Sequence, residues 1–264
     1  MLQKLKERSS TVQTLSSTVT LVLSGGAAKS GGVSRTEYHP VDGILLARLP
    51  GDIQIVGKLP LVGTRLFEMV SNGNSYRLSI TAPTKKGQWA EGDITTATES
   101  ESALVKLPND ILRGLFVNVL QYVDNPDVHS VLEEAVLEQR PYYVVAFNAT
   151  DKASRDDQLV EKFWIDRSMS DFAVARKTVF EKDGKVQTDA RFSKYEMMGA
   201  FSFPMEIQMD FPLVDCSVKM VFDSEKVKLN SELSGEAFQL ERPAGAELLR
   251  QSASKAASSG CAGL

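Results

Sequence analysis

This chain has few residues of the kinds that catalyse reactions or bind metals. Its 264 residues include only two histidines and two cysteines. His39, His129, Cys216 and Cys261 lie far apart and show no zinc-ligand spacing. Cys216 falls in a strand-like run and Cys261 in a terminal tail, so a disulfide framework is not indicated. We therefore expect no metal site, no cofactor and no catalytic group.

Long apolar runs and excess positive charge are also absent. No stretch approaches the roughly 18 apolar residues of a membrane-spanning helix, and the segment Met1–Lys6 lacks the apolar core of a signal peptide. The formal net charge is −4, and the basic residues are scattered. Since binding to nucleic acid needs clustered Lys and Arg, we expect no nucleic-acid partner.

Apolar residues at a spacing of two dominate what is present. Residues Leu2 to Leu15 predict a helix. Strands follow it, separated by Gly, Pro and Asn-Gly, which favours an antiparallel meander. The predicted strands of this N-terminal group are Thr18–Ser24, Gly43–Leu49, Ile53–Lys58, Thr64–Val70, Tyr76–Thr81 and a short piece around Trp89.

The pattern changes to helical spacing over residues 104–140. After Pro108, the apolar residues Ile111, Leu112, Leu115 and Phe116 form a wide stripe with a period of 3.6. A second helix is predicted after Asn125-Pro126, and the residues expected on its inner face are Val128, Val131, Leu132, Ala135 and Val136. Neither helix can stand alone, so we expect both to cover the face of a sheet.

From Pro141 the period returns to two. Asp183-Gly184 is a strong hairpin signal between two of the predicted strands. These strands are Tyr142–Ala149, Leu159–Asp166, Phe172–Glu181, Lys185–Tyr195, Met205–Phe211, Cys216–Phe222 and Phe238–Glu241. About eleven antiparallel strands curl or close rather than stay flat. The predicted fold is mainly β with inserted helices (α+β): an incomplete antiparallel β-barrel covered by a helical lid.

One loop is unusual because it is apolar. Loops usually run over the surface and are polar, but Leu59-Pro60-Leu61-Val62-Gly63 contains no charged residue. The sequence leaves two readings of Leu59, Leu61 and Val62. Either they fold back over the mouth of the barrel, or they contact something apolar outside the protein.

Three segments resemble the bacterial lipoprotein-carrier family, which is LolA/LolB-like. They are Asp42–Pro50, then Phe163–Arg167 followed by Phe203–Ile207, and finally Leu229–Leu233 with Phe238–Gly245. Their common order covers residues 1 to about 248, which we expect to form one domain, with the lid at about 104–140. Residues 249–264 are rich in Ser, Ala and Gly and are expected to be a disordered tail.

The resemblance implies a non-catalytic protein that binds lipid or lipoprotein acyl chains in an apolar cavity, for transfer to or insertion into the outer membrane. It implies a periplasmic monomer in transient contact with a membrane, with an anchor through a lipidated N-terminal cysteine that this chain lacks. In the receptor branch of the family, a protruding loop with an exposed leucine helps insertion, and Leu61 has the matching place. The membrane-contact loop is then Leu59, Leu61 and Val62.

The resemblance also suggests which residues line the lid and the cavity. These are Ile111, Leu112, Leu115, Phe116, Trp164, Met198, Phe201 and Phe203. Ordinary core packing predicts the same residues. Met and Phe suit a ligand site that tolerates different shapes.

One position departs from the carrier branch. That branch has an arginine directly before the proline, and this arginine latches the lid. Leu49 occupies the place here, and the nearest arginine is Arg48. Because a shift of one residue moves a strand side chain to the opposite face, Arg48 is expected outside. The departure favours the receptor-like branch.

Two other function classes remain open. A sensor or scaffold module of the same fold would bind a protein partner. A hydrolase would need paired carboxylates, but Asp166, Asp171, Asp183 and Glu196 show no pairing by spacing.

Overall fold

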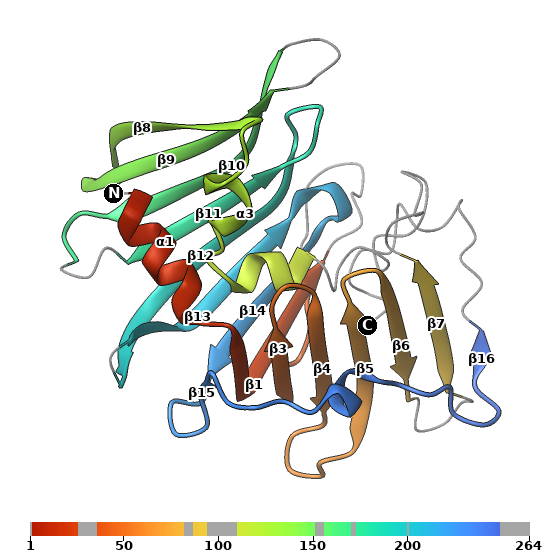
Figure 1. Cartoon of the computed structure of the whole chain (residues 1–264). Coiled ribbons are helices and arrows are strands. Elements are labelled where there is room, and N and C mark those ends of the chain that lie inside the picture. Colours follow the sequence, from red (N-terminus) through yellow and green to blue (C-terminus); the bar gives the residue numbers. More distant parts are fainter. Residues whose placement is uncertain are drawn as a thin grey trace. The chain divides into compact units, whose positions relative to one another are not determined.

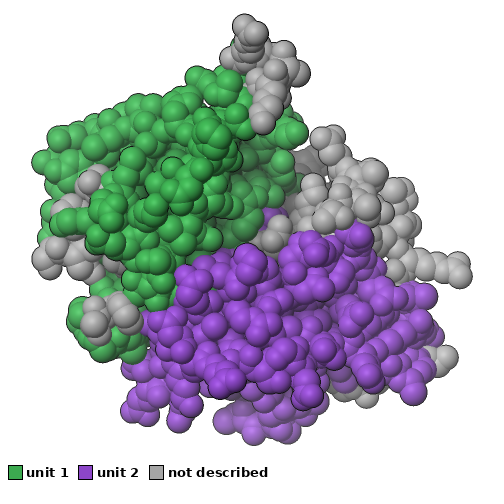
Figure 2. Space-filling model, viewed as in Figure 1, with its two compact units in different colours: residues 1–12, 113–213 green, residues 13–112, 214–264 purple. Residues whose placement is uncertain are grey.

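The computed structural model describes residues 2–25, 36–81, 87–93, 110–150, 156–169, 173–199 and 201–248. The described residues form a mainly β protein with sixteen strands, where the sequence predicted about eleven. The helices among them are α1 (Leu2–Thr11), α3 (Leu120–Val123) and a helical turn at residues 110–115. The chain divides into two compact units (Figure 2), which are described separately.

Unit 2 comprises Gln13–Leu112 and Val214–Leu264. Its sheet has the strand order β16-β7-β6-β5-β4-β3-β1-β14 (Figure 1), and β2 and β15 also pair with β1. Neighbouring strands are antiparallel except β16, which is parallel to β7. The strands are β1 (Thr14–Gly25), β2 (Thr36–Glu37), β3 (Val41–Arg48), β4 (Asp52–Lys58), β5 (Arg65–Asn72), β6 (Ser75–Ile80), β7 (Gln88–Asp93), β14 (Cys216–Phe222), β15 (Lys228–Leu229) and β16 (Glu247–Leu248).

Unit 1 comprises Met1–Val12 and Arg113–Leu213. Its antiparallel sheet has the order β13-β12-β11-β10-β9-β8. The strands are β8 (Val128–Leu137), β9 (Arg140–Thr150), β10 (Asp157–Asp166), β11 (Val174–Phe180), β12 (Val186–Met198) and β13 (Phe201–Phe211). The Asp183-Gly184 hairpin is confirmed: Gly184 has φ +81°, and its N–H donates to the Glu181 carbonyl. Glycine suits this left-handed position because it has no Cβ.

Helical segments of unit 1 cover one face of its sheet (Figure 1). Helix α1 packs against α3, and Ser9 Oγ accepts a hydrogen bond from the Val119 N–H at 3.0 Å. Gly114 lies directly on Met209 of β13, since a Cβ there would be 2.5 Å from the Met209 sulfur. The backbone of this segment therefore approaches the sheet more closely than any larger residue would permit.

Three sequence predictions are wrong. Residues 128–137 form strand β8, not the second helix of a lid. The segment Phe238–Glu241 is not a strand: the chain there forms a 3₁₀ turn, η2 (Gly235–Phe238). Cys216 is disulfide-bonded, and the only other cysteine in the sequence, Cys261, lies outside the described residues.

Other predictions are confirmed or lie outside the described part. The N-terminal helix is present but ends at Thr11, because β1 begins at Thr14. The predicted disordered tail and residues 104–109 of the predicted lid are outside the described residues. Among the described helices, none has the length and apolar character to cross a membrane.

Candidate functional site

The apolar loop between β4 and β5 points into solvent. Leu61 is fully exposed, with a relative accessibility of 108%, and Val62 is 74% exposed. Pro60 is exposed as well, whereas Leu59 is half-buried. Of the two readings that the sequence left open, the structure excludes the one in which Leu61 and Val62 pack back over the protein.

The backbone of this loop is held in a conformation that leucine rarely adopts. Leu61 has φ +67°, and the Val62 N–H donates to the Pro60 carbonyl at 2.8 Å. This three-residue hydrogen-bonded turn with a positive central φ is a γ-turn of the rare, strained kind. Two further bonds close the loop, from the Leu59 N–H to Thr64 O (2.8 Å) and from the Gly63 N–H to Leu59 O (3.0 Å). The loop is thus an ordered projection.

Two cations stand opposite each other where the strands enter the loop. Lys58 of β4 is the cross-strand partner of Arg65 of β5. Arg65 forms an ion pair with Glu68, which is buried and also accepts from Gln54 Nε2 at 2.7 Å. The Glu68 carboxylate anchors Arg65 to the strand, so the base of the apolar tip is polar and fixed.

Arg48 lies on the outer face of β3, as predicted. The strand buries Leu45 and Ala47 on one face, and Arg48 projects from the other. Its guanidinium binds Asp52 at 2.5 Å, donates to the Leu233 carbonyl at 3.2 Å and stacks 4.9 Å from the Phe238 ring centroid. Arg48 therefore fixes the C-terminal segment of unit 2.

The residues predicted to line a lid are buried. Ile111, Leu112, Leu115 and Phe116 are each at most 6% exposed. Leu115 and Phe116 belong to unit 1, where the chain from Arg113 to Val123 lies over β9, β10 and β11: the Tyr122 ring stacks on Phe147 at 4.9 Å. These apolar side chains have the burial that both a lid and an ordinary core require.

A buried ion pair that the sequence pattern did not predict fastens this segment to the sheet. Lys177 of β11 and Glu161 of β10 are 3% and 0% exposed, and their Nζ and Oε1 atoms are 2.8 Å apart. Lys177 Nζ also donates to the carbonyls of Arg113 (2.5 Å) and Phe116 (2.9 Å). Both carbonyls lie at the end of the helical turn, where no intrahelical donor remains. Lys177 therefore caps the helical turn from beneath.

Burial perturbs the two titratable groups beside Glu161. Loss of water raises the pKa of Tyr122 well above its ordinary value, and the neighbouring Glu161 carboxylate raises it further. Burial lowers the pKa of Lys177, and the same carboxylate opposes that shift. The charge of one carboxylate thus acts on both the ammonium of Lys177 and the phenol of Tyr122.

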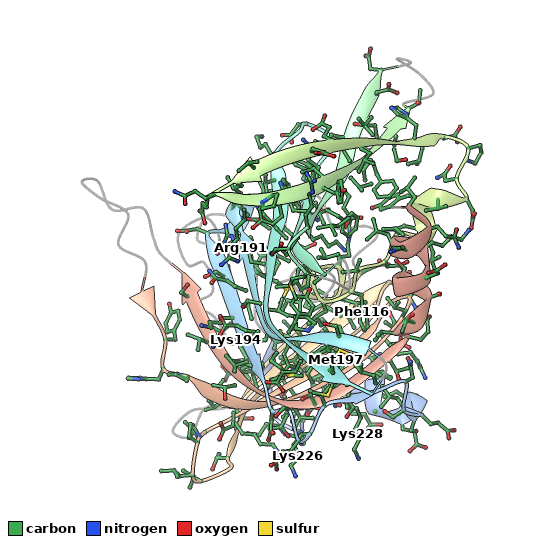
Figure 3. The ribbon with its side chains drawn as sticks, turned by 90° about the vertical axis from the view of Figure 1, so that its left-hand side faces the viewer. Phe116, Arg191, Lys194, Met197, Lys226 and Lys228 are labelled. Atoms are coloured by element: carbon green, nitrogen blue, oxygen red, sulfur yellow. The ribbon has the colours of Figure 1, made fainter. Side chains whose placement is uncertain are left out.

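The remaining predicted cavity residues do not form one group. Trp164 is half-buried, and the guanidinium of its cross-strand partner Arg176 lies 4.8 Å from the centroid of the Trp164 ring. The adjacent Phe163 projects to the buried face, where its ring centroid lies 5.5 Å from Lys177 Nζ. Phe203 is buried on β13, and the Phe201 side chain lies outside the described part. Met198 is half-buried at the end of β12, beside an exposed Met197 (Figure 3).

The candidate metal ligands and carboxylates can be placed on the described part of the chain. No group of three potential metal ligands occurs within the described ranges. Asp166 is buried and accepts from the Ser168 N–H and hydroxyl, Asp183 is in the β11–β12 turn, and Asp171 lies outside these ranges. A pocket of about 340 Å³ lies in unit 2, and none of the predicted cavity residues lines it; its lining residues are Val70, Ser71, Asn72, Ser75, Arg77, Phe238 and Gln239.

Comparison with known proteins gives similarity in structure but not in sequence. No family model and no curated protein matches the sequence. A LolA superfamily protein from Nitrosomonas europaea superposes over 90% of this chain and 97% of its own, with a TM-score of 0.53 and 14% identity. The chain has a LolA-like fold. At this identity, the likeness establishes the fold alone.

Two further structures match over a similar extent. A putative outer membrane lipoprotein-sorting protein domain from Vibrio parahaemolyticus has 11% identity, a TM-score of 0.49 and coverage of 90% and 94% of the two chains. A DUF1329 family protein from Desulfovibrio piger has 12% identity, a TM-score of 0.48 and coverage of 90% and 93%.

Proposed function

We propose that this protein is a non-catalytic carrier or receptor that binds the acyl chains of lipids or lipoproteins and delivers them to a membrane. The observation that carries the proposal is the full exposure of Leu61 in a strained turn. Strained backbone conformations cluster at functional sites. An exposed Leu-Val pair in a soluble domain is suited to entering an apolar phase such as a bilayer.

Acyl-chain transport explains why such a fold needs a covered apolar face. Each CH₂ group removed from water is worth about 0.8 kcal/mol, so several long chains require an apolar enclosure. In unit 1, the segment from Arg113 to Val123 covers Phe147, Phe163 and Met209 of the sheet. Because this segment lies directly on the sheet, we place the acyl chains there after it has moved away from the sheet, and Leu115, Phe116 and Phe203 would then contact them.

A disulfide at Cys216 is consistent with the proposed location outside the cytoplasm. Disulfides persist in the periplasm and other oxidising compartments and are rare in reducing ones. A periplasmic monomer in transient contact with the outer membrane is consistent with the proposed role. An anchoring lipid on an upstream cysteine would fit the receptor form of this role.

The test separates lipid uptake from membrane delivery. The full chain, the Leu61→Glu variant and a control, Leu213→Glu, are loaded with a fluorescent fatty acid and mixed with phosphatidylglycerol-containing liposomes. Leu213 is 48% exposed on a 3₁₀ turn of unit 1, which makes it a matched exposed leucine. Because burying one leucine is worth about 1.5–3 kcal/mol, transfer should fall roughly tenfold or more in Leu61→Glu only.

Uptake should be the same in all three proteins, and their melting temperatures should agree closely, since both leucines are exposed. A chain that takes up no fatty-acid probe would refute the carrier role altogether. Normal uptake with normal transfer in Leu61→Glu would refute the role of the loop. A large loss of stability in that variant would show that the loop is part of the core.

A further inference from the structure

Strand β8 is an exposed edge. It is the outermost strand of the unit 1 sheet and pairs with β9 over its full length, from Val128 opposite Ala149 to Leu137 opposite Arg140. Within the described ranges, no strand pairs with its outer edge. An edge strand presents unpaired backbone N–H and C=O groups that can pair with another chain.

Strand β8 has little of the usual protection of edge strands. Natural edges are kept short or carry charged side chains, above all lysine, or proline or a bulge, and of these devices β8 has only the charges of Glu133 and Glu134. This strand has ten residues, VHSVLEEAVL, and pairs with β9 without a register shift. It contains neither lysine nor proline. A long, regular edge of this kind is suited to accepting an additional strand.

The side chains of β8 are apolar and exposed on both faces. Leu132 and Val136, on one face, are 55% and 74% exposed; Val131 and Leu137, on the other, are 40% and 45% exposed. Successive strand residues alternate between faces. An added strand would therefore cover apolar surface on both sides of the sheet at once.

Charge at the centre of β8 defines what the added strand must carry. On one face, Glu134 is already paired with Arg167 at 2.7 Å. On the other face, Glu133 lies between Val131 and Ala135, and its cross-strand partner is Val144. Among the residues described, Glu133 forms no ion pair. Because opposite charges on neighbouring strands are stabilising and like charges are not, Glu133 favours a strand with a basic residue beside it.

The same charge argues against a second copy of this chain. Antiparallel pairing of two β8 strands about their centre would bring the Glu133-Glu134 pairs of both copies together. Four carboxylates would then gather at one edge, with only Arg167 of each copy to offset them. Repulsion between like charges opposes this pairing.

We propose that β8 is the docking edge for an extended segment of another polypeptide, with apolar side chains at alternate positions and a lysine or arginine beside Glu133. The segment adds to the sheet as a further strand. Main-chain hydrogen bonds supply affinity, and the alternate side chains supply selectivity. This inference does not depend on acyl-chain binding.

The test uses three labelled 11-residue peptides with the full chain. The first alternates Val and Thr around a central Lys, the second has Glu at the centre, and the third is the Lys peptide with alternate backbone amides N-methylated. Fluorescence anisotropy should show the Lys peptide binding about fivefold more tightly than the Glu peptide, the difference expected from one cross-strand charge pair. The N-methylated peptide should not bind, since it lacks the donors.

Charge reversal on the protein provides the matched comparison. Glu133→Lys should invert the preference between the two charged peptides, whereas Glu225→Lys, at an exposed turn of unit 2, should leave it unchanged. Hydrogen exchange should slow at the β8 amides in the complex. Equal binding of all three peptides, binding without protection of β8, or dimers of the chain that form through β8 would each overturn the proposal.

Discussion

Leu61 and Lys177 each occupy the environment that the other would normally prefer. Leu61 is an apolar side chain held fully in water, on a loop of unit 2. Lys177 is a charged side chain held in the interior of unit 1, 3% exposed. The interactions of the two side chains also differ. Lys177 has a carboxylate and two carbonyls, whereas Leu61 is held only through the backbone of its turn.

The difference indicates where each residue acts. A buried charge is tolerated only when it is paired and hydrogen-bonded, so Lys177 is committed to holding its own fold together. An exposed leucine in a strained turn contributes nothing comparable to folding, and the proposed function gives it a partner outside the chain. The buried site should therefore govern stability, and the exposed site should govern function.

Replacing one member of the buried pair should produce the largest effect. In Lys177→Met, the Glu161 carboxylate remains buried without its counter-ion, and the free energy of unfolding should fall by about 3–5 kcal/mol. Urea denaturation monitored by the fluorescence of the two tryptophans measures this change. Lys162→Met, a half-buried neighbour on β10, is the control and should change stability by less than about 1 kcal/mol.

A second substitution sharpens this test. Glu161→Leu combined with Lys177→Met removes both charges and should recover about 2 kcal/mol of the loss, because an apolar pair leaves no buried charge. Recovery should be incomplete, since the carbonyls of Arg113 and Phe116 lose their donor. A double variant no more stable than Lys177→Met would show that the two side chains are not coupled.

Alkaline pH should reveal the phenol beside the same carboxylate. The pKa of Tyr122 is raised above its ordinary value of 10.0, by burial and then by Glu161. Its contribution to stability is therefore complete below pH 10 and declines as the pH rises above 10, where the unfolded chain releases the proton first. The stability difference between the wild type and Tyr122→Phe should narrow by about 1 kcal/mol between pH 10 and pH 11.

Urea titrations of both proteins at pH 8, 10 and 11 measure this stability difference. Lys177 is present in the wild type and in Tyr122→Phe, so its own effect on stability cancels when the two proteins are compared. The difference should be constant from pH 7 to pH 9. A difference that stays constant up to pH 11 would mean that the Tyr122 hydroxyl is not buried beside Glu161 in solution.

Much of the sheet could be predicted from the sequence, but β8 could not. The alternation in β1, β3 and β6 reports a face that is buried and a face that is not. Strand β8 is exposed on both faces, so its apolar residues do not alternate, and Val128, Val131, Leu132, Ala135 and Val136 match helical spacing equally well. Its hairpin turn also lacks a signal: Glu138 and Gln139 both have positive φ without a glycine.

The site was predictable only in part, for a different reason. The apolar composition of the β4–β5 loop marked it as unusual, but only the geometry shows that Leu61 faces solvent. The sequence does contain a signal for the buried pair. Glu161 lies on the same face of its strand as the buried residues Phe163 and Ile165, and Lys177 lies on the same face as Val179. A charged residue within a buried period indicates an ion pair, but the partner depends on strand register, which a single sequence does not specify.

The variant with the smallest expected change in stability, Leu61→Gly, distinguishes most clearly between a role of Leu61 in stability and a role in function. Leu61→Gly removes a side chain from a position with φ +67°. Relief of a left-handed leucine is worth roughly 1–2 kcal/mol, and the greater freedom of glycine in the unfolded chain offsets part of it. We therefore expect a gain of about 0.5–1 kcal/mol in urea denaturation. Transfer of a fluorescent fatty acid to liposomes should nevertheless fall, as in Leu61→Glu. A variant that is less stable and transfers normally would reverse the assignment, because Leu61 would then serve the fold and not the membrane.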